Sequence, residues 1–227
     1  MEEILQTLIN KFINLFKWPI AVYMIVLLPA IFKSIDYFKF TNMKFVYFGA
    51  GIVAYIFIRA ASDSGTRTSL QTLIHELTHS FFALLTFHKI KKISLNQDNG
   101  GEMAFEGEGN WLIIIAPYFF PLMILFYIAI TSIWSAFLPT NFIFPIILGY
   151  LFGMHLDTVV SQIHEKQTDL PKVSYLFCAM FLPGANLITW GFILAYNSIG
   201  IGGISTYFRL INRLTSQFYS AMWQSLF

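Results

Sequence analysis

Long apolar segments dominate this chain of 227 residues and limit what it can fold into. A helix that crosses a lipid bilayer needs about 20 mostly apolar residues. Six stretches reach or approach that length: 18–32, 45–58, 69–87, 111–137, 142–163 and 170–196. Charged residues make up only 11% of the chain, against about 25% in a typical soluble domain. The sequence therefore predicts an all-α integral membrane protein with about six transmembrane helices.

Two segments differ from the predicted spans. Asp98-Asn99-Gly100-Gly101 is a strong turn signal, and short strands are expected on either side of it, which predicts a β-hairpin over about 89–106. In the last stretch, 204–227, apolar residues recur near the helical period with polar residues between them, which predicts an amphipathic helix. No repeat or linker divides the chain, so we expect a single membrane domain, 1–227.

Composition excludes several classes of function. The one cysteine, Cys178, excludes a disulfide framework and a cysteine-based zinc site. A formal net charge of +2 without a basic stripe argues against nucleic acid as a partner. The chain begins with Met1-Glu2-Glu3 and lacks the features of a secretory signal peptide, so we expect the first span to be retained.

The third apolar stretch contains the motif His75-Glu76-Leu77-Thr78-His79. Residues four apart in a helix lie on one face, so the two histidines can bind the same zinc ion. Glu76 projects beside the open coordination position, where it can act as general base on a water molecule that zinc activates. Ionisable groups are costly inside a span and usually functional. The motif therefore predicts a zinc metalloprotease that holds one Zn²⁺ per chain.

A catalytic zinc normally has three protein ligands, so one more must come from elsewhere in the chain. The candidates are the polar residues near the later spans: His155, Asp157, His164, Glu165 and Asp169. Asp169 precedes Pro171 at the start of a predicted helix, and the residues alone favour its explanation as a helix cap over a metal ligand. His155 is also explained by a hydrogen bond between helices. The residues alone leave this choice open.

The segment His75–Thr86, followed by the basic strand Lys89–Leu95, Asn99-Gly100-Gly101 and Ala116-Pro117, resembles the site-2 protease family of intramembrane zinc metallopeptidases. It is most similar to a compact bacterial branch, and the resemblance extends over about 69–196. It implies a multi-pass protein of the bacterial cytoplasmic membrane. It also implies that His75 and His79 are zinc ligands, that Glu76 is the catalytic base, and that a distant aspartate completes the site.

The aspartate is where this chain departs from the family. The usual Leu-Asp-Gly after an Asn-Pro stretch is absent, and Leu156-Asp157-Thr158 is the nearest string. The compact branch has a Ser-Asp or Thr-Asp pair before its last span, and Thr168-Asp169 matches that pattern. The resemblance therefore favours Asp169 as the third ligand, with His155 and Asp157 as alternatives.

The resemblance also implies a membrane-protein substrate that must unwind to expose a peptide bond. The predicted hairpin either accepts the extended substrate at its edge or only caps the helix bundle. Candidate substrate-binding residues are Asn110, Asn186 and Gln167. Two other functions remain open: a non-enzymatic membrane scaffold with a degenerate site, and a zinc hydrolase of a non-peptide membrane substrate. A transporter is disfavoured because the short chain lacks repeats and paired broken spans.

Overall fold

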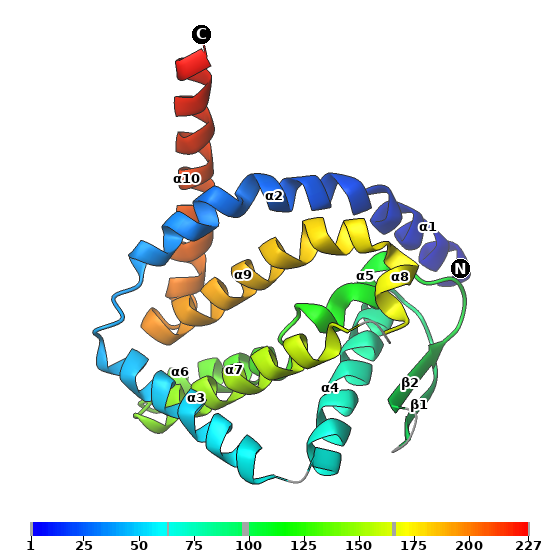
Figure 1. The fold of residues 1–227 in the computed structure, drawn as a ribbon, viewed down its shortest axis with the longest axis horizontal. Coiled ribbons are helices and arrows are strands. Elements are labelled where there is room, and N and C mark those ends of the chain that lie inside the picture. The colour runs from blue at the N-terminus through cyan, green and yellow to red at the C-terminus, as the bar shows by residue number, and fades with distance from the viewer. Residues whose placement is uncertain (1, 63, 97–99, 165–166, 227) are drawn as a thin grey trace.

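A computed structural model describes residues 2–62, 64–96, 100–164 and 167–226. The described chain is almost entirely helical, with one small sheet (Figure 1). Its helices are α1 (Glu2–Leu15), α2 (Lys17–Ser34), α3 (Met43–Ala61), α4 (Ser64–Leu85), α5 (Trp111–Ile115), α6 (Leu122–Phe137), α7 (Ile143–Gln162), α8 (Asp169–Val173), α9 (Tyr175–Ile199) and α10 (Ile201–Leu226). The strands are β1 (Ile90–Asn96) and β2 (Gly100–Phe105).

Four of the described helical segments are long and apolar enough to cross a membrane: Lys17–Tyr37, Met43–Ala61, Ile143–Gln162 and Tyr175–Ile199. A fifth span is possible if α5 and α6 form one broken span, which bends by 78°. The predicted count of six is therefore not confirmed. The difference lies in α4, because its threonines, serines, histidines and charged residues lower its hydropathy. The long apolar helices nevertheless make the chain a membrane protein.

The bend between α5 and α6 lies at two prolines, Pro117 and Pro121. Proline has no backbone N–H and its ring obstructs the preceding turn, so two prolines this close together favour a break in the helix. The predicted span 170–196 is interrupted as well. Ser174 has a φ of 78° and separates α8 from α9. This break places Asp169 on a short helix of its own.

Small residues let α3 and α7 pack closely. A Cβ on Gly51 would collide with the backbone of Ile146, and a Cβ on Gly149 would collide with the backbone of Phe48. Such small residues at helix interfaces are the usual means of close packing in membranes. On the other side of the bundle α2 lies along α9, and α10 packs on both before its end projects away (Figure 1).

The predicted hairpin is confirmed. Strands β1 and β2 pair antiparallel, with Ile93 opposite Met103 and an irregularity between Ile90 and Lys92. Part of the predicted turn, residues 98 and 99, lies outside the described residues. Both strands contact α4, so the hairpin lies along the helix that carries the motif (Figure 1). The predicted C-terminal helix is also present, as α10.

Candidate metal centre

Helix α4 carries both histidines of the motif on one face, because residues four positions apart are separated by about one turn. The Nε2 atoms of His75 and His79 are 3.0 Å apart. The two rings are inclined by 79°, with their centroids 4.7 Å apart. Both side chains are buried. The helix thus directs two imidazole nitrogens at one point inside the molecule.

Helix α8 brings Asp169 to the same point. Its Oδ2 lies 3.2 Å from Nε2 of His79 and 3.5 Å from Nε2 of His75. The other oxygen, Oδ1, accepts a hydrogen bond of 3.1 Å from Lys172, and Tyr118 donates one of 3.4 Å to Oδ2. Burial raises the pKa of the Asp169 carboxyl, but its interactions with the two histidines and Lys172 lower that pKa by more, to well below the usual range. Asp169 is therefore ionised at neutral pH.

The spacing of these three ligand atoms fits a metal ion. All of them lie within 4.8 Å of one another, and the separations are 3.0, 3.2 and 3.5 Å. A zinc ion with tetrahedral ligands at about 2.0–2.1 Å holds neighbouring ligand atoms about 3.3 Å apart. Two imidazole nitrogens and one carboxylate oxygen are also a donor set found in catalytic zinc sites. The residues present therefore fit a zinc ion in both geometry and chemistry.

The second ring nitrogen of His79 is held by the backbone. Its Nδ1 donates a hydrogen bond of 2.7 Å to the carbonyl oxygen of Ile113. Histidines that bind metals usually make such a bond, because it leaves Nε2 free to face the metal. Ile113 belongs to α5, and Asn110 caps that helix by accepting 3.1 Å hydrogen bonds from the N–H groups of Leu112 and Ile113. Asn110 thus positions His79 through the backbone of α5.

The corresponding nitrogen of His75 faces a small cavity. Its Nδ1 is buried without a hydrogen-bond partner among the described residues, as is Nε2 of His155. Both residues line a cavity of about 20 Å³, which is room for one water molecule. A water there would accept a hydrogen bond from Nδ1 of His75, the ring nitrogen that faces away from the metal. Metal-binding histidines usually make such a bond. The structure thus places His155 behind His75, outside the cluster of three ligand atoms.

Glu76 lies against the hairpin. Its side chain is buried and touches the backbone of β2 at Gly101, where an added Cβ would lie 2.6 Å from Cγ and 2.7 Å from Oε1 of Glu76. The same Cβ would lie 2.6 Å from Cγ2 of Thr72. Only glycine fits here without displacing Glu76. The hairpin therefore limits where the carboxylate can lie.

The sequence around this site also matches a known protein family. Residues 48–158 match the family model described as Peptidase M50B-like. The chain belongs to the site-2 protease family. The matched segment runs from α3 to α7 and includes the motif, the hairpin and α5, whereas Asp169 lies beyond it. No curated protein and no solved structure is significantly similar to the chain. The match to the family model confirms the resemblance to the site-2 protease family that the motif indicated.

Asp157, an alternative third ligand, lies elsewhere in this site-2 protease family member. Its Oδ2 accepts hydrogen bonds from Tyr55 at 2.6 Å, from Arg59 at 2.7 Å and from Gln71 at 2.8 Å. These contacts join α7 to α3 and to the beginning of α4. Asp157 thus ties the motif helix to the bundle, and three donors share its Oδ2.

The remaining predicted residues surround the cluster at greater distance. Asn186 donates 3.0 Å hydrogen bonds to the carbonyl oxygens of Tyr118 and Leu182, while its Oδ1 is buried without a partner among the described residues. Gln167 lies in the connection before α8 and donates a hydrogen bond to Gln162 at the end of α7. His164 lies in the same connection and is exposed. The further candidate at position 165 lies outside the described residues.

Sequence reasoning missed Tyr118, which contacts two members of the cluster. Its ring packs edge-on against His75, with centroids 5.3 Å apart, and its hydroxyl donates to Asp169. The nearest signal in the sequence is Ala116-Pro117, which the family resemblance had singled out without assigning its neighbour a role.

Polar His88 at the end of α4 is fully buried, and hydrogen bonds join it to Thr86 and Asn10.

Proposed function

We propose that this chain is a zinc metalloendopeptidase of a bacterial cytoplasmic membrane, which cuts membrane proteins in or near their transmembrane segments. The observation that carries the proposal is the convergence of His75, His79 and Asp169 on one point, with the buried Glu76 next to His75 on the same helix. Membership of the site-2 protease family supports this chemistry. We expect one zinc ion per chain.

Side chains of this chain hold the metal, transfer the proton and keep the metal ligand Asp169 in place. A zinc ion held by the three ligands supplies a Lewis acid that polarises a carbonyl group and lowers the pKa of water to about 7. Glu76 takes a proton from the attacking water and later delivers it to the leaving amine. Lys172 and Tyr118 keep the Asp169 carboxylate oriented through their hydrogen bonds. Burial of the cluster strengthens these electrostatic interactions, because the local dielectric constant is low.

The substrate must be extended where it is cut, because a helix shields its own peptide bonds. Strand β2 pairs with β1 on one side only, in a two-stranded sheet, and its Gly101 lies against Glu76. An extended segment added to the free edge of β2 would therefore run past the catalytic base. Strand addition of this kind uses backbone hydrogen bonds and so tolerates many sequences.

The helical part of the substrate needs an apolar surface next to the site. An apolar cavity of about 720 Å³ lies between α7 and α9 and is lined in part by Leu170, the residue after Asp169. Asn186 also lines it, and its unpartnered Oδ1 can accept a hydrogen bond from a substrate N–H that loses its helical partner. Gln167 stands in the connection that leads to Asp169. We assign this cavity to the substrate's transmembrane segment.

Metal removal tests the proposal directly. Cleavage of a set of single-span reporter proteins by the purified chain in detergent, followed by mass spectrometry, is expected to fall to background with 1,10-phenanthroline. Zinc added back should restore it, because the three ligands remain in place. The isomer 1,7-phenanthroline, which does not chelate, serves as the matched control. Cleavage that persists in the chelator would contradict a metal-dependent reaction.

A Gly101→Ala variant is expected to cleave about 10- to 100-fold more slowly, because its new Cβ displaces Glu76 and small misplacements of catalytic groups are costly. Zinc content should not change, because the nearest atoms to the added Cβ belong to Glu76 and Thr72 and not to the three ligands. The matched control is Gly49→Ala in α3, whose added Cβ meets nothing within 4 Å. Equal rates for the two variants would show that the hairpin does not position Glu76.

A further inference from the structure

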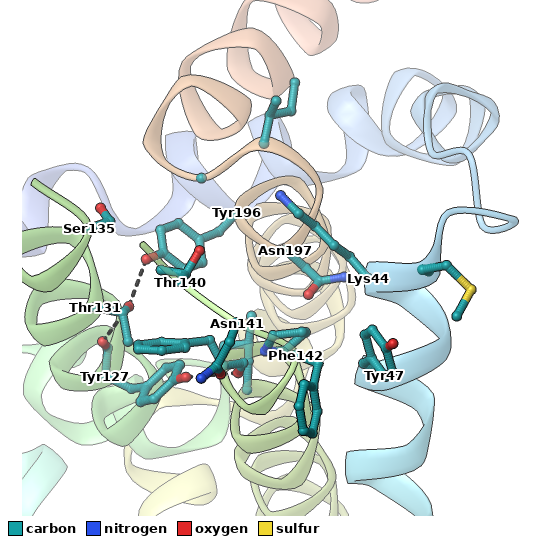
Figure 2. A pocket seen from close by; sticks show the side chains of 16 residues that line it. Lys44, Tyr47, Tyr127, Thr131, Ser135, Thr140, Asn141, Phe142, Tyr196 and Asn197 are labelled. Atoms are coloured by element: carbon teal, nitrogen blue, oxygen red, sulfur yellow. Dashed lines mark hydrogen bonds between the residues drawn. The ribbon is translucent and has the colours of Figure 1, made fainter. Parts of the chain in front are cut away.

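A third cavity lies at the opposite end of α7 from the metal cluster. It has a volume of about 450 Å³ and is bordered by the beginnings of α3 and α7 and by the ends of α6 and α9 (Figure 2). Three of these helices are candidate spans and the fourth belongs to the bent pair. Because all four begin or end here, the cavity lies where the spans leave the apolar part of the bilayer. Lipid headgroups occupy this level.

Two side chains in this cavity, Asn197 and Lys44, have N–H groups without an acceptor among the described residues. Asn197 is only 6% exposed, and its Nδ2 has no partner among the described residues. Lys44 donates one hydrogen bond of 3.1 Å to the carbonyl oxygen of Ser198, which leaves two of its three N–H groups for another acceptor. Figure 2 shows the Asn197 amide beside the Lys44 side chain. Lys44 is exposed, but Asn197 is buried, and a buried donor without an acceptor is costly. The Asn197 amide therefore calls for a ligand that accepts hydrogen bonds, and Lys44 lies beside it with N–H groups to spare.

The charge of the cavity specifies that ligand further. No aspartate or glutamate belongs to its lining in the part of the chain that the structure describes, whereas Lys44 does. The connection from Lys33 to Lys44 carries three lysines and one acidic residue, Asp36. Basic segments next to a membrane span attract anionic lipids. The missing acceptor is therefore an anion.

Apolar side chains continue from the donors toward the bilayer. Phe142, Phe144 and Ile199 line the cavity, and Phe142 and Ile199 are more than half exposed. An anion with an apolar tail would place its charge against Lys44 and Asn197 and its tail along these residues. A free inorganic anion would leave that surface uncovered. We propose that this cavity binds the phosphate of an anionic phospholipid, with Lys44 and Asn197 as its donors.

The test uses the full-length chain in detergent, with phosphatidylglycerol, phosphatidylcholine and inorganic phosphate as probes. Affinities come from the dependence of thermal unfolding on the concentration of each probe. Phosphatidylglycerol should bind at least about fivefold more tightly than phosphatidylcholine, which has the same phosphodiester but no net charge. Lys44→Gln should weaken phosphatidylglycerol binding by about fivefold. Asn197→Asp, which has the same shape but replaces a donor by a negative charge, should weaken it by more.

The matched control is Lys39→Gln, which removes an exposed charge outside the lining and should weaken the binding less than Lys44→Gln does. Circular dichroism and size-exclusion chromatography establish that each variant folds. Equal binding of phosphatidylglycerol by wild type, Lys44→Gln and Asn197→Asp would overturn the site, and so would an equal loss in Lys39→Gln. Stabilisation by inorganic phosphate alone, lost in the same two variants, would overturn the lipid as its occupant. None of these outcomes depends on zinc or on proteolysis.

Discussion

Replacement of Glu76 by glutamine is expected to lower the cleavage rate by about three orders of magnitude while the zinc content stays at one per chain. Glutamine has nearly the same shape as glutamate but cannot accept a proton from water. The three ligand atoms come from other side chains, so the metal should remain. The rate is measured on a cleaved reporter protein, and the zinc by elemental analysis of the same preparation.

The matched control for this variant is Glu106→Gln. Glu106 is exposed on the connection after the hairpin, and its side chain forms a 3.9 Å ion pair with Lys91, which contributes little. The Glu106→Gln variant should cleave the reporter protein as fast as the wild type. If Glu76→Gln cleaves as fast as this control, another residue is the general base.

The Glu76→Gln variant also serves to identify the substrate, because it binds without completing the reaction. Crosslinking in membranes, followed by mass spectrometry, would show what it holds. A transmembrane protein supports the endopeptidase. A lipid-linked molecule without a peptide bond would contradict it and favour a hydrolase of another class.

Replacement of Asp169 by alanine is expected to reduce bound zinc from one per chain to less than about 0.2, because the site loses one of its three protein ligands, and the only one of the three with a negative charge. Elemental analysis in detergent, after dialysis in zinc-replete buffer, measures the change. Two controls separate a lost ligand from a general effect on folding. His155→Ala and Asp157→Asn both alter polar side chains of α7 outside the cluster and should retain zinc.

The three variants together decide among the alternatives for the third ligand. Zinc lost in His155→Ala but kept in Asp169→Ala would make His155 the ligand, and the contacts of Asp169 would then be hydrogen bonds only. A reduced affinity in His155→Ala with full occupancy at saturating zinc agrees with a role behind His75, since such partners typically change metal affinity about 10- to 100-fold. A wild-type chain without zinc in replete buffer would end the metalloprotease proposal.

Local patterns in the sequence were sufficient for several features of the fold. The turn signal around Gly100 predicted the hairpin, because turn chemistry depends on a few adjacent residues. The four-residue spacing of His75 and His79 predicted that they share a helix face, because the helical period is a property of the backbone. The same short motif indicated the family, which the match over residues 48–158 confirmed.

The number of spans was not predictable in the same way. Apolar content over 111–137 suggested one span, but the chain breaks at Pro117 and Pro121 into two helices that diverge by 78°. The motif helix is less apolar than a typical span, although many of its polar groups are buried. Hydropathy measures the composition of a segment. It does not report whether neighbouring helices cover its polar groups.

The sequence by itself determined which residues are the candidates for chemistry in this protein, because the motif and the apolar background belong to the chain before it folds. Only the tertiary structure decided which distant side chain meets the histidines. His155, Asp157 and Asp169 were all plausible, and the break at Ser174 together with the packing of α8 directs Asp169 to the cluster. Asp157 is instead turned toward Arg59. Contacts between helices far apart in the chain depend on how the whole bundle packs, and local spacing does not encode that.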